Sequence, residues 1–197
     1  MVATATPPSA PPAAAAQVSL RINGLPVSVP AGTTILAAAR QVQVKIPTLC
    51  QNDDLQPTAA CGLCIVQVAG QGRMARACCT PVVEGMEITT HSGELTEIRR
   101  TVIELILSNH PNSCLTCGRN GTCELQALAA DFGIRVENIK RSVPDLKSDN
   151  YNGSIILDFT KCIKCGRCAQ TSCNSWQTCT HRPHLMHLVK SRMIEPL

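Results

Sequence analysis

Residues 109–126 read NHPNSCLTCGRNGTCELQ and place His110 three residues ahead of a Cys-x2-Cys-x5-Cys run formed by Cys114, Cys117 and Cys123. A single histidine after a helix is usually unremarkable. At this spacing, however, an imidazole nitrogen can close a four-ligand site with three thiolates. A neutral histidine in place of a thiolate leaves such a site less negative, which raises its reduction potential if other factors stay equal. The stretch therefore predicts a His/Cys cluster site.

Helices are predicted on both sides of this site. Residues 94–108 carry apolar side chains at helical spacing, and residues 124–132 predict a short helix that ends at Gly133, which suits a left-handed cap. The apolar positions of the first helix are Leu95, Ile98, Val102, Leu105 and Ile106. His91, which precedes this helix, has no cysteine group at a matching spacing, so we predict that it is a surface residue.

A second group of cysteines lies upstream, in the pattern C-x10-CGLC-x13-C. Its members are Cys50, Cys61, Cys64 and Cys78. Thiolates suit iron, and the small residue Gly62 lets backbone amides point at cluster sulfides. A structural zinc site also uses Cys-x2-Cys pairs, and the gap of ten residues departs from the gap of four in plant-type ferredoxins. Spacing alone therefore leaves both iron–sulfur and zinc open.

Cys79 stands beside Cys78 and competes with it as the fourth ligand. Neighbouring residues of an extended segment point to opposite sides, so only one of the two can face the site. We expect Cys78 to be the ligand and Cys79 to be a buried small hydrophobic residue.

The residues around this group predict a compact sheet. Asn23-Gly24 between apolar-patterned segments from Val18 to Val29 is typical of a hairpin. Thr33 then precedes a helical run through Val42, and further strands are expected at 65–68 and 86–90. A hairpin, one helix and returning strands together favour a β-grasp arrangement.

A third group, in residues 161–168 (KCIKCGRC), has the Cys-x2-Cys-x2-Cys spacing of 4Fe-4S ferredoxins through Cys162, Cys165 and Cys168. In such ferredoxins the fourth cysteine follows after three residues, whereas here Cys173 follows after four, and there is no second motif. Cys179 and His181 are alternative ligands. The sequence leaves open whether this site fills.

Composition excludes several other classes of protein. The chain has 197 residues with thirteen cysteines and only four aromatic residues. This composition favours small domains held together at their cysteines over one domain with a large apolar core. A disulfide framework needs an oxidising compartment, and the first twenty residues lack the features of a secretory signal. No run approaches the ~20 apolar residues that span a bilayer. We expect a cytoplasmic protein without membrane insertion.

The net charge of +4 is carried by the end of the chain. Residues 161–197 hold six basic side chains and one acidic one, and residues 1–160 hold 12 and 13. This segment has one aromatic residue and no nucleic-acid-binding motif, so no nucleic-acid partner is predicted. We expect its basic side chains to lie on a solvated face that partly offsets the charge of a nearby cluster.

Residues 18–172 resemble the N-terminal electron-entry part shared by iron-only hydrogenases, the largest peripheral subunit of bacterial complex I, and related diaphorase or formate dehydrogenase subunits. The phrases that carry this resemblance are IPTLC, CGLCIVQV, ACCTPV, LILSNHPNSCLTCGRNGTCELQ and KCIKCGRC. No residue of a hydrogen-activating site is present. The residues do not decide between the hydrogenase and complex I lines, although the short linker between the second and third groups slightly favours hydrogenase.

The resemblance implies an α+β chain with a β-grasp 2Fe-2S ferredoxin domain, a small helical His(Cys)3 4Fe-4S domain and an incomplete 4Fe-4S ferredoxin-like segment. The expected boundaries are a disordered Pro/Ala-rich leader at 1–16, the domains at 17–93 and 94–139, a linker at 140–154, the partial segment at 155–173 and a divergent basic tail at 174–197. Cys50, Cys61, Cys64 and Cys78 would hold the 2Fe-2S cluster. His110, Cys114, Cys117 and Cys123 would hold the 4Fe-4S cluster.

The predicted function is electron transfer between a reduced carrier or flavoprotein and a catalytic partner, without catalysis by this chain alone. Because the family pattern stops after Cys173, we expect a shortened gene product, with a native partner-binding tail as the alternative. Three further readings stay open: a fragment of an iron-only hydrogenase, a zinc-binding structural or interaction protein, and a thiol redox enzyme.

Overall fold

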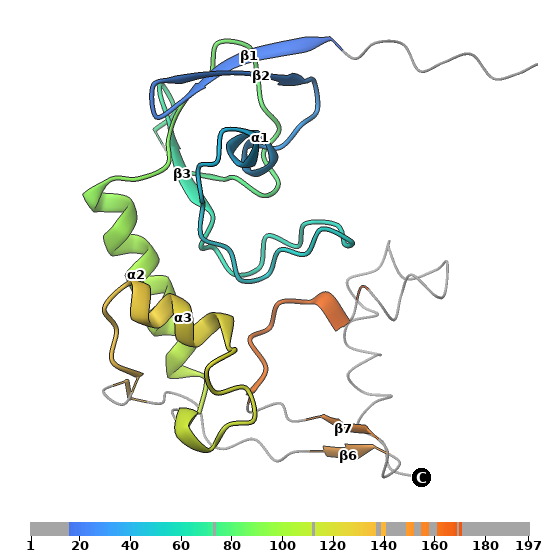
Figure 1. Ribbon diagram of the computed structural model, residues 1–197, viewed down its shortest axis with the longest axis vertical. Coiled ribbons are helices and arrows are strands. Elements are labelled where there is room, and N and C mark those ends of the chain that lie inside the picture. The colour runs from blue at the N-terminus through green and yellow to red at the C-terminus, as the bar shows by residue number, and fades with distance from the viewer. Residues whose placement is uncertain are drawn as a thin grey trace, which may run out of the picture.

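The computed structural model describes residues 16–72, 74–111, 113–136, 139–140, 149–151, 155–157, 161–168 and 170 (Figure 1). A five-stranded mixed sheet, of order β2-β1-β5-β3-β4, dominates the N-terminal half. Its strands are β1 (Gln17–Ile22), β2 (Leu25–Pro30), β3 (Ile65–Val68), β4 (Ala75–Arg76) and β5 (Glu87–Thr89). Strands β1 and β5 run parallel, and the other neighbouring pairs are antiparallel. The predicted strands are confirmed, and β4 is an addition to them.

The hairpin between β1 and β2 turns at the predicted dipeptide. Asn23 and Gly24 both have positive φ angles, 51° and 83°, as a tight two-residue turn requires. This turn fixes the register in which Leu20 lies opposite Val27. Both of these side chains are buried, because alternate residues of each strand point into the core.

Helix α1 (Ile35–Gln41) packs on the sheet and closes the first core. The helix begins at Ile35, the first apolar residue of the predicted run, and Thr34 is its cap: the Thr34 hydroxyl accepts a hydrogen bond from the Ala37 amide at 3.3 Å. Thr33 instead donates its hydroxyl proton to the Pro30 carbonyl. The core beneath α1 also includes Cys64 and Cys78, so the sheet directly supports two cysteines of the first group.

Two helices follow the sheet. Helix α2 (Gly93–Ser108) begins at the Ser92 cap and leads into the short helix η1 (Cys114–Thr116), and α3 (Glu124–Asp131) begins directly after Cys123. The buried face of α2 differs from the predicted stripe: its members are Leu95, Arg99, Ile103 and Leu107. Leu105 is 62% exposed, so its expected place in the stripe is wrong.

A second hydrophobic core joins α2 and α3 to the loop of the first cysteine group. Its fully buried members are Leu49, Leu63, Ile103, Leu107, Leu125, Leu128, Ala129 and Ile134. Leu49 and Leu63 stand next to cysteines of the first group, whereas the other members come from the helical region or follow it directly. The loop between α1 and β3 is therefore anchored on the helices as well as on the sheet.

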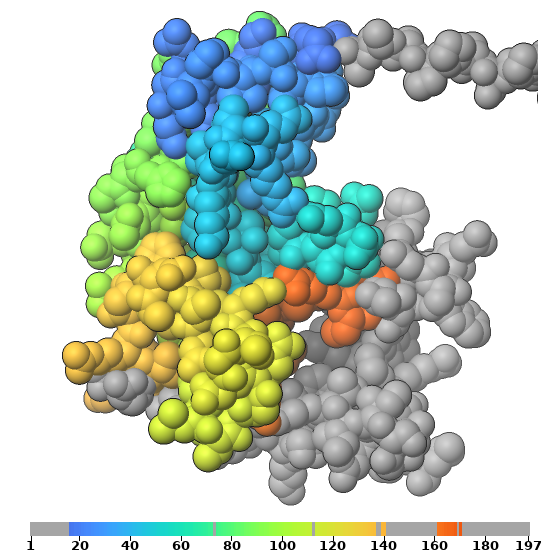
Figure 2. Space-filling model, viewed as in Figure 1, coloured from blue at the N-terminus to red at the C-terminus, as the bar shows by residue number. Residues whose placement is uncertain are grey.

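A small second sheet lies further along the chain. Strands β6 (Asp149–Tyr151) and β7 (Ile155–Leu157) pair antiparallel, so part of the segment expected to be a linker forms a strand. The third cysteine segment, residues 161–168 and 170, runs between the first-group loop and the α3 region (Figures 1 and 2). The expected disordered leader lies almost entirely outside the described residues, and the basic tail lies wholly outside them.

Candidate functional site

The four cysteines of the first group meet in two pairs. The side chains of Cys50 and Cys61 interact with each other, and so do those of Cys64 and Cys78. The pairs are close enough that Cys50 and Cys78 interact electrostatically. The structure therefore brings all four predicted residues of this group together.

The surroundings of these thiols differ. Burial is the largest influence on Cys50 and would raise its pKa, but hydrogen bonds from Cys61, Thr58 and Ala60 outweigh it and leave that pKa below the ordinary value. Burial, with an added contribution from Cys64, raises the pKa of Cys78 well above the ordinary value. Burial therefore favours the protonated form of Cys78, whereas the hydrogen bonds around Cys50 favour its thiolate.

The structure separates Cys78 from Cys79. Cys78 is buried and faces Cys64, as predicted for the ligand. Cys79 is exposed and its sulfur contacts only the Arg76 carbonyl, at 3.6 Å, among the contacts that the structure describes. The expectation that Cys79 is a buried hydrophobic residue is wrong, because the segment is a turn over residues 77–79 that leaves the Cys79 side chain at the surface.

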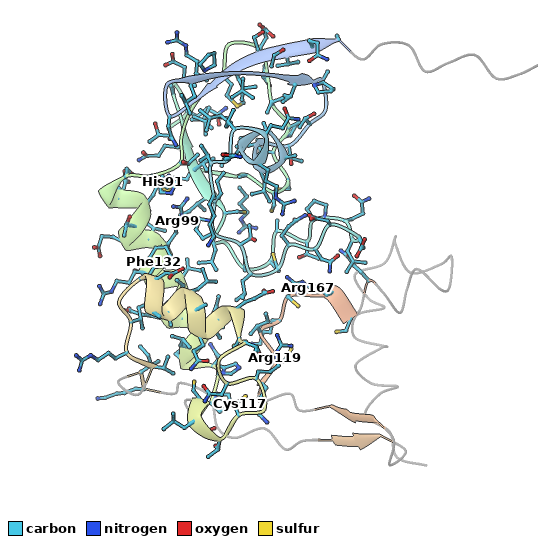
Figure 3. The ribbon with its side chains drawn as sticks, viewed as in Figure 1. His91, Arg99, Cys117, Arg119, Phe132 and Arg167 are labelled. Atoms are coloured by element: carbon cyan, nitrogen blue, oxygen red, sulfur yellow. The ribbon has the colours of Figure 1, made fainter. Side chains whose placement is uncertain are left out.

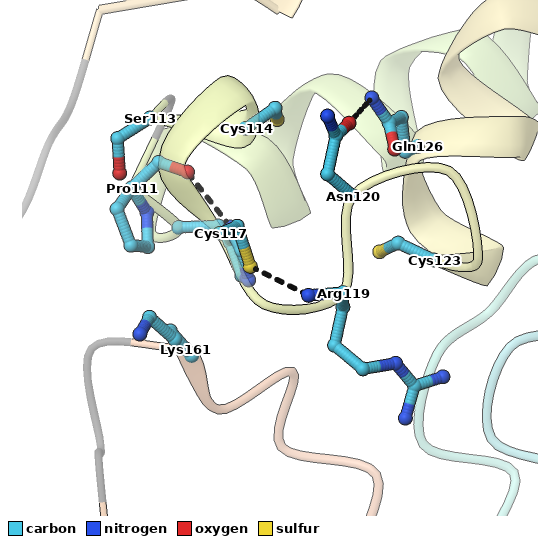
Figure 4. A pocket seen from close by; sticks show the side chains of 10 residues that line it. Pro111, Ser113, Cys114, Cys117, Arg119, Asn120, Cys123, Gln126 and Lys161 are labelled. Carbon is cyan, nitrogen blue, oxygen red and sulfur yellow. Dashed lines mark hydrogen bonds between the residues drawn. The ribbon is translucent and has the colours of Figure 1, made fainter.

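The second group lines one cavity (Figure 4). His110, Cys114, Cys117 and Cys123 all contribute to its wall, together with Arg119 and Lys161. The loop between Cys117 and Cys123 is tied to α3 through Gln126, which accepts a hydrogen bond from the Gly121 amide and donates one to Asn120. Gly121 has a φ of +78°, a conformation that favours glycine. These contacts hold three thiols and one imidazole around a common space.

The orientation of His110 suits metal binding. Its Nδ1 atom lies 3.0 Å from the Pro111 carbonyl oxygen, which can only accept a hydrogen bond. The proton is therefore assigned to Nδ1, and Nε2 keeps a free lone pair. His91, by contrast, is exposed and hydrogen-bonds the adjacent Thr90 hydroxyl, as expected for a surface residue.

The third group is docked against the loop of the first. The Arg167 guanidinium donates hydrogen bonds to the carbonyls of Leu49 (2.8 Å), Cys50 (3.3 Å) and Gln51 (2.6 Å). The Thr58 hydroxyl donates to the Cys165 carbonyl at 3.0 Å, and the Gln170 side chain donates to Gln56. Figure 3 shows Arg167 directed at this loop. Spacing alone gave no sign of these contacts, and Cys173, Cys179 and His181 lie outside the described residues.

The same backbone hydrogen bond recurs in all three groups. The amide two residues after a cysteine points at that cysteine's sulfur: Leu63 toward Cys61, Arg119 toward Cys117 at 3.5 Å, and Lys164 toward Cys162 at 3.4 Å. Positive φ angles at Gly62 and Lys164 help to direct these amides. In each group, therefore, a loop amide is directed at a cysteine sulfur, which is how backbone N–H groups hydrogen-bond the sulfurs of iron–sulfur sites.

The hydrogen bonds of Arg167 are expected to stabilise the first-group loop to an extent that hydrogen exchange can measure. Arg167→Gln is expected to speed amide hydrogen exchange in residues 49–58 roughly tenfold or more, because several charge-assisted hydrogen bonds to one segment are lost. Arg40→Gln is the matched control, since it removes an exposed ion pair with Asp53 in the same loop, and such pairs contribute little. Equal exchange rates in the two variants would show that Arg167 does not anchor the loop.

Neither a single-ion site nor a membrane span is found in the described part of the chain. No three of its His, Cys, Asp and Glu side chains converge on one ion position. None of the eleven cysteines in that part forms a disulfide. None of its helices combines the length and the apolar character needed to cross a membrane.

Comparisons with known proteins identify a cluster-binding region over each of the two complete groups. Residues 15–93 match the 2Fe-2S iron-sulfur cluster binding domain, and residues 99–137 match the NADH-ubiquinone oxidoreductase-G iron-sulfur binding region. The first match contains all four first-group cysteines, and the second contains His110 and its three cysteines. The chain thus carries a 2Fe-2S and a 4Fe-4S binding region, and the paired thiols and the His/Cys cavity fit these groups.

Relatives extend the similarity over most of this chain. It is 42% identical over 167 residues to the NADP-reducing hydrogenase subunit HndD of Solidesulfovibrio fructosivorans, covering 82% of this chain and 28% of that protein. It is 35% identical over 181 residues to the G-type subunit of NADH-quinone oxidoreductase from Streptomyces coelicolor, covering 87% of this chain and 21% of that protein.

A solved structure shows a similar arrangement. The crystal structure of an NAD+-reducing [NiFe]-hydrogenase in the H2-reduced state superposes with a TM-score of 0.75 at 28% identity, covering 82% of this chain and 68% of that one. The two matched cluster-binding regions and the relatives point to the same kind of protein. The chain therefore contains two successive iron–sulfur cluster-binding regions and is similar over most of its length to part of a hydrogenase subunit and part of the G-type subunit of NADH-quinone oxidoreductase.

Proposed function

We propose that this chain carries single electrons between a redox carrier or flavoprotein and a catalytic partner of the hydrogenase or NADH dehydrogenase type. The observation that carries the proposal is the shared second core. Cys61, Cys123 and Ile163, one residue from each cysteine group, pack against the same buried apolar cluster. The rate of electron transfer falls steeply as the distance between two centres grows. A core that all three cysteine groups share would hold the distances between their centres constant.

The proposed ligands are the histidine and the cysteines of the first two groups. Cys50, Cys61, Cys64 and Cys78 would hold the 2Fe-2S cluster. His110, through Nε2, and Cys114, Cys117 and Cys123 would hold the 4Fe-4S cluster. When bound, these clusters supply the one-electron chemistry. The polypeptide orients the ligands, directs amides at their sulfurs and excludes water from the buried pairs.

The proposal also specifies the domain organisation. The sheet with α1 forms a β-grasp 2Fe-2S domain at 17–93, the helical region at 94–139 forms the His(Cys)3 domain, and residues 155–173 form part of a ferredoxin-like segment. Mixed strand directions and one covering helix support the first assignment. A further 4Fe-4S cluster on Cys162, Cys165 and Cys168 needs a fourth ligand, for which Cys173 is the candidate.

The proposed partners are redox proteins. The two curated relatives are subunits of a hydrogenase and of NADH-quinone oxidoreductase, and the solved structure is that of an NAD+-reducing hydrogenase. This chain spans 28% and 21% of the length of those two relatives. A partner would supply the flavin or the catalytic metal that this proposal does not place on the described residues. We propose a cytoplasmic location for this exchange.

Metal content tests the proposed function. Anaerobically purified protein is expected to contain about six irons per chain, two plus four from the two matched regions, and to show both reduced-cluster signals by electron paramagnetic resonance. About ten irons would show that the third group also fills. Zinc without iron would refute electron transfer and favour a structural zinc protein.

A further inference from the structure

Arg99 is a buried cation beside the first cysteine group. It lies in the middle of the buried face of α2, and only 2% of its surface is exposed. Its Nε atom donates to the Leu63 carbonyl at 3.2 Å, and its Nη2 atom donates to the Ile65 carbonyl at 2.6 Å. These two carbonyls flank Cys64, so the guanidinium spans the residue that pairs with Cys78. Figure 3 shows Arg99 between α2 and the sheet.

The positive charge of Arg99 has no acidic partner in the described part of the chain, where the ion pairs involve other residues. Burial lowers the pKa of Arg99, and the electrostatic interaction with Cys64 opposes that effect. A guanidinium nevertheless stays protonated in proteins. Because an uncompensated buried charge is costly, the position calls for negative charge nearby. The thiols of the first group are the source that the structure places closest.

A purely structural role would be a clamp that fastens α2 to the cluster loop. That role needs the two hydrogen bonds but not a charge, and neutral donors make such bonds without the desolvation cost of an ion. Arg99 carries a full charge, is almost completely buried and lies beside the proposed thiolate ligands. We therefore expect its charge to act on the first cysteine group, in addition to fastening α2 to the loop.

We propose that Arg99 is the internal counter-cation of the first site and raises its reduction potential. A cluster held by four thiolates carries net negative charge that increases on reduction, so a fixed buried cation favours the reduced form. The inference rests on the proposed assignment of Cys50, Cys61, Cys64 and Cys78 to the 2Fe-2S cluster. Arg99 acts through electrostatics and position, and it is not itself a ligand.

The test compares four variants of the full chain, purified anaerobically. Arg99→Gln and Arg99→Met remove the charge, Arg99→Lys keeps it, and Arg100→Gln removes an equal charge from the exposed neighbour that pairs with Glu104. The readout is the midpoint potential of the 2Fe-2S signal in a titration monitored by electron paramagnetic resonance. Iron content and thermal unfolding are measured alongside.

The neutral Arg99 variants are expected to lower the reduced-to-oxidised ratio at a fixed ambient potential roughly tenfold. This change equals a shift of about 59 mV to more negative potential for a one-electron couple. Arg99→Lys should stay near the unsubstituted protein, and so should Arg100→Gln, whose charge is screened by solvent. The signal of the 4Fe-4S cluster should keep its potential in all four variants.

Each other outcome also decides the matter. Unchanged potentials in the neutral variants, or an equal shift in Arg99→Lys, would overturn the counter-cation role and leave only the clamp. If the neutral variants lose the 2Fe-2S iron while Arg99→Lys retains it, the positive charge at residue 99 is needed for the cluster to be incorporated, which supports the counter-cation role. Loss of iron in all three Arg99 variants would assign the residue to folding. Absence of 2Fe-2S iron in the unsubstituted protein would instead refute the site assignment.

Discussion

Cys78→Ser is expected to remove the 2Fe-2S cluster, at a cost of about two irons per chain, whereas Cys79→Ser is expected to keep it. The two cysteines are adjacent, yet Cys78 is buried against Cys64 and Cys79 is exposed. A serine hydroxyl is a far weaker ligand for iron than a thiolate, because it stays protonated and is a harder donor. The measurement is iron content together with the visible and paramagnetic spectra of both variants.

This pair of variants separates ligation from general damage. Both substitutions make the same chemical change within two consecutive residues, so a difference in iron content reports the position of the thiol rather than the sensitivity of the segment. The 4Fe-4S signal serves as an internal reference in each sample. Loss of the 2Fe-2S signal in Cys79→Ser with retention in Cys78→Ser would reverse the assignment.

Sequence spacing was enough to single out the candidate ligands, because cluster sites demand particular residue types at short intervals. The positions of Cys50, Cys61, Cys64 and Cys78 implied one site, and the structure brings these four together as two pairs. The hairpin was equally predictable, since Asn23-Gly24 has few alternatives to a tight turn. Local chemistry of this kind depends on residues that are close along the chain, so a sequence reveals it directly.

Contacts between distant segments were not predictable in the same way. Arg99 was absent from the predicted stripe of α2 because an arginine in a helix pattern is normally assigned to the solvated face. It became buried only because the Leu63 and Ile65 carbonyls, more than thirty residues away, face that position. Only tertiary structure reveals such a partner.

Arg167 illustrates the same limit in the third group. Its basic side chain was assigned to a solvated face, but it is only partly exposed and donates to three consecutive carbonyls of the first-group loop. The prediction failed for a physical reason. A guanidinium has five N–H donors that can bind several carbonyls at once, but every residue has a backbone carbonyl, so the sequence does not show which carbonyls will be the acceptors. The correction also gives the third segment a definite contact with the first site.

His110→Ala is expected to remove most of the 4Fe-4S cluster, a loss approaching four irons per chain, while the 2Fe-2S signal persists. His110 lines the cavity with the three cysteines of its group, and its Nδ1 contact with Pro111 leaves Nε2 for iron. Alanine supplies no donor atom, and apart from the three cysteines the polar side chains that line the cavity are hydroxyl, amide or cationic groups, which suit cluster iron less well than an imidazole or a thiolate. Iron analysis and the reduced spectrum measure the loss.

His91→Ala is the matched control, because it removes an exposed imidazole just before the same helix and is expected to leave both clusters intact. His110→Cys tests the electronic role of the ligand. If the thiolate reaches the cluster, the additional negative charge should move the 4Fe-4S potential to more negative values, since reduction then adds an electron to a more negative centre. Full 4Fe-4S iron in His110→Ala would show that another group supplies the fourth ligand and that His110 is structural.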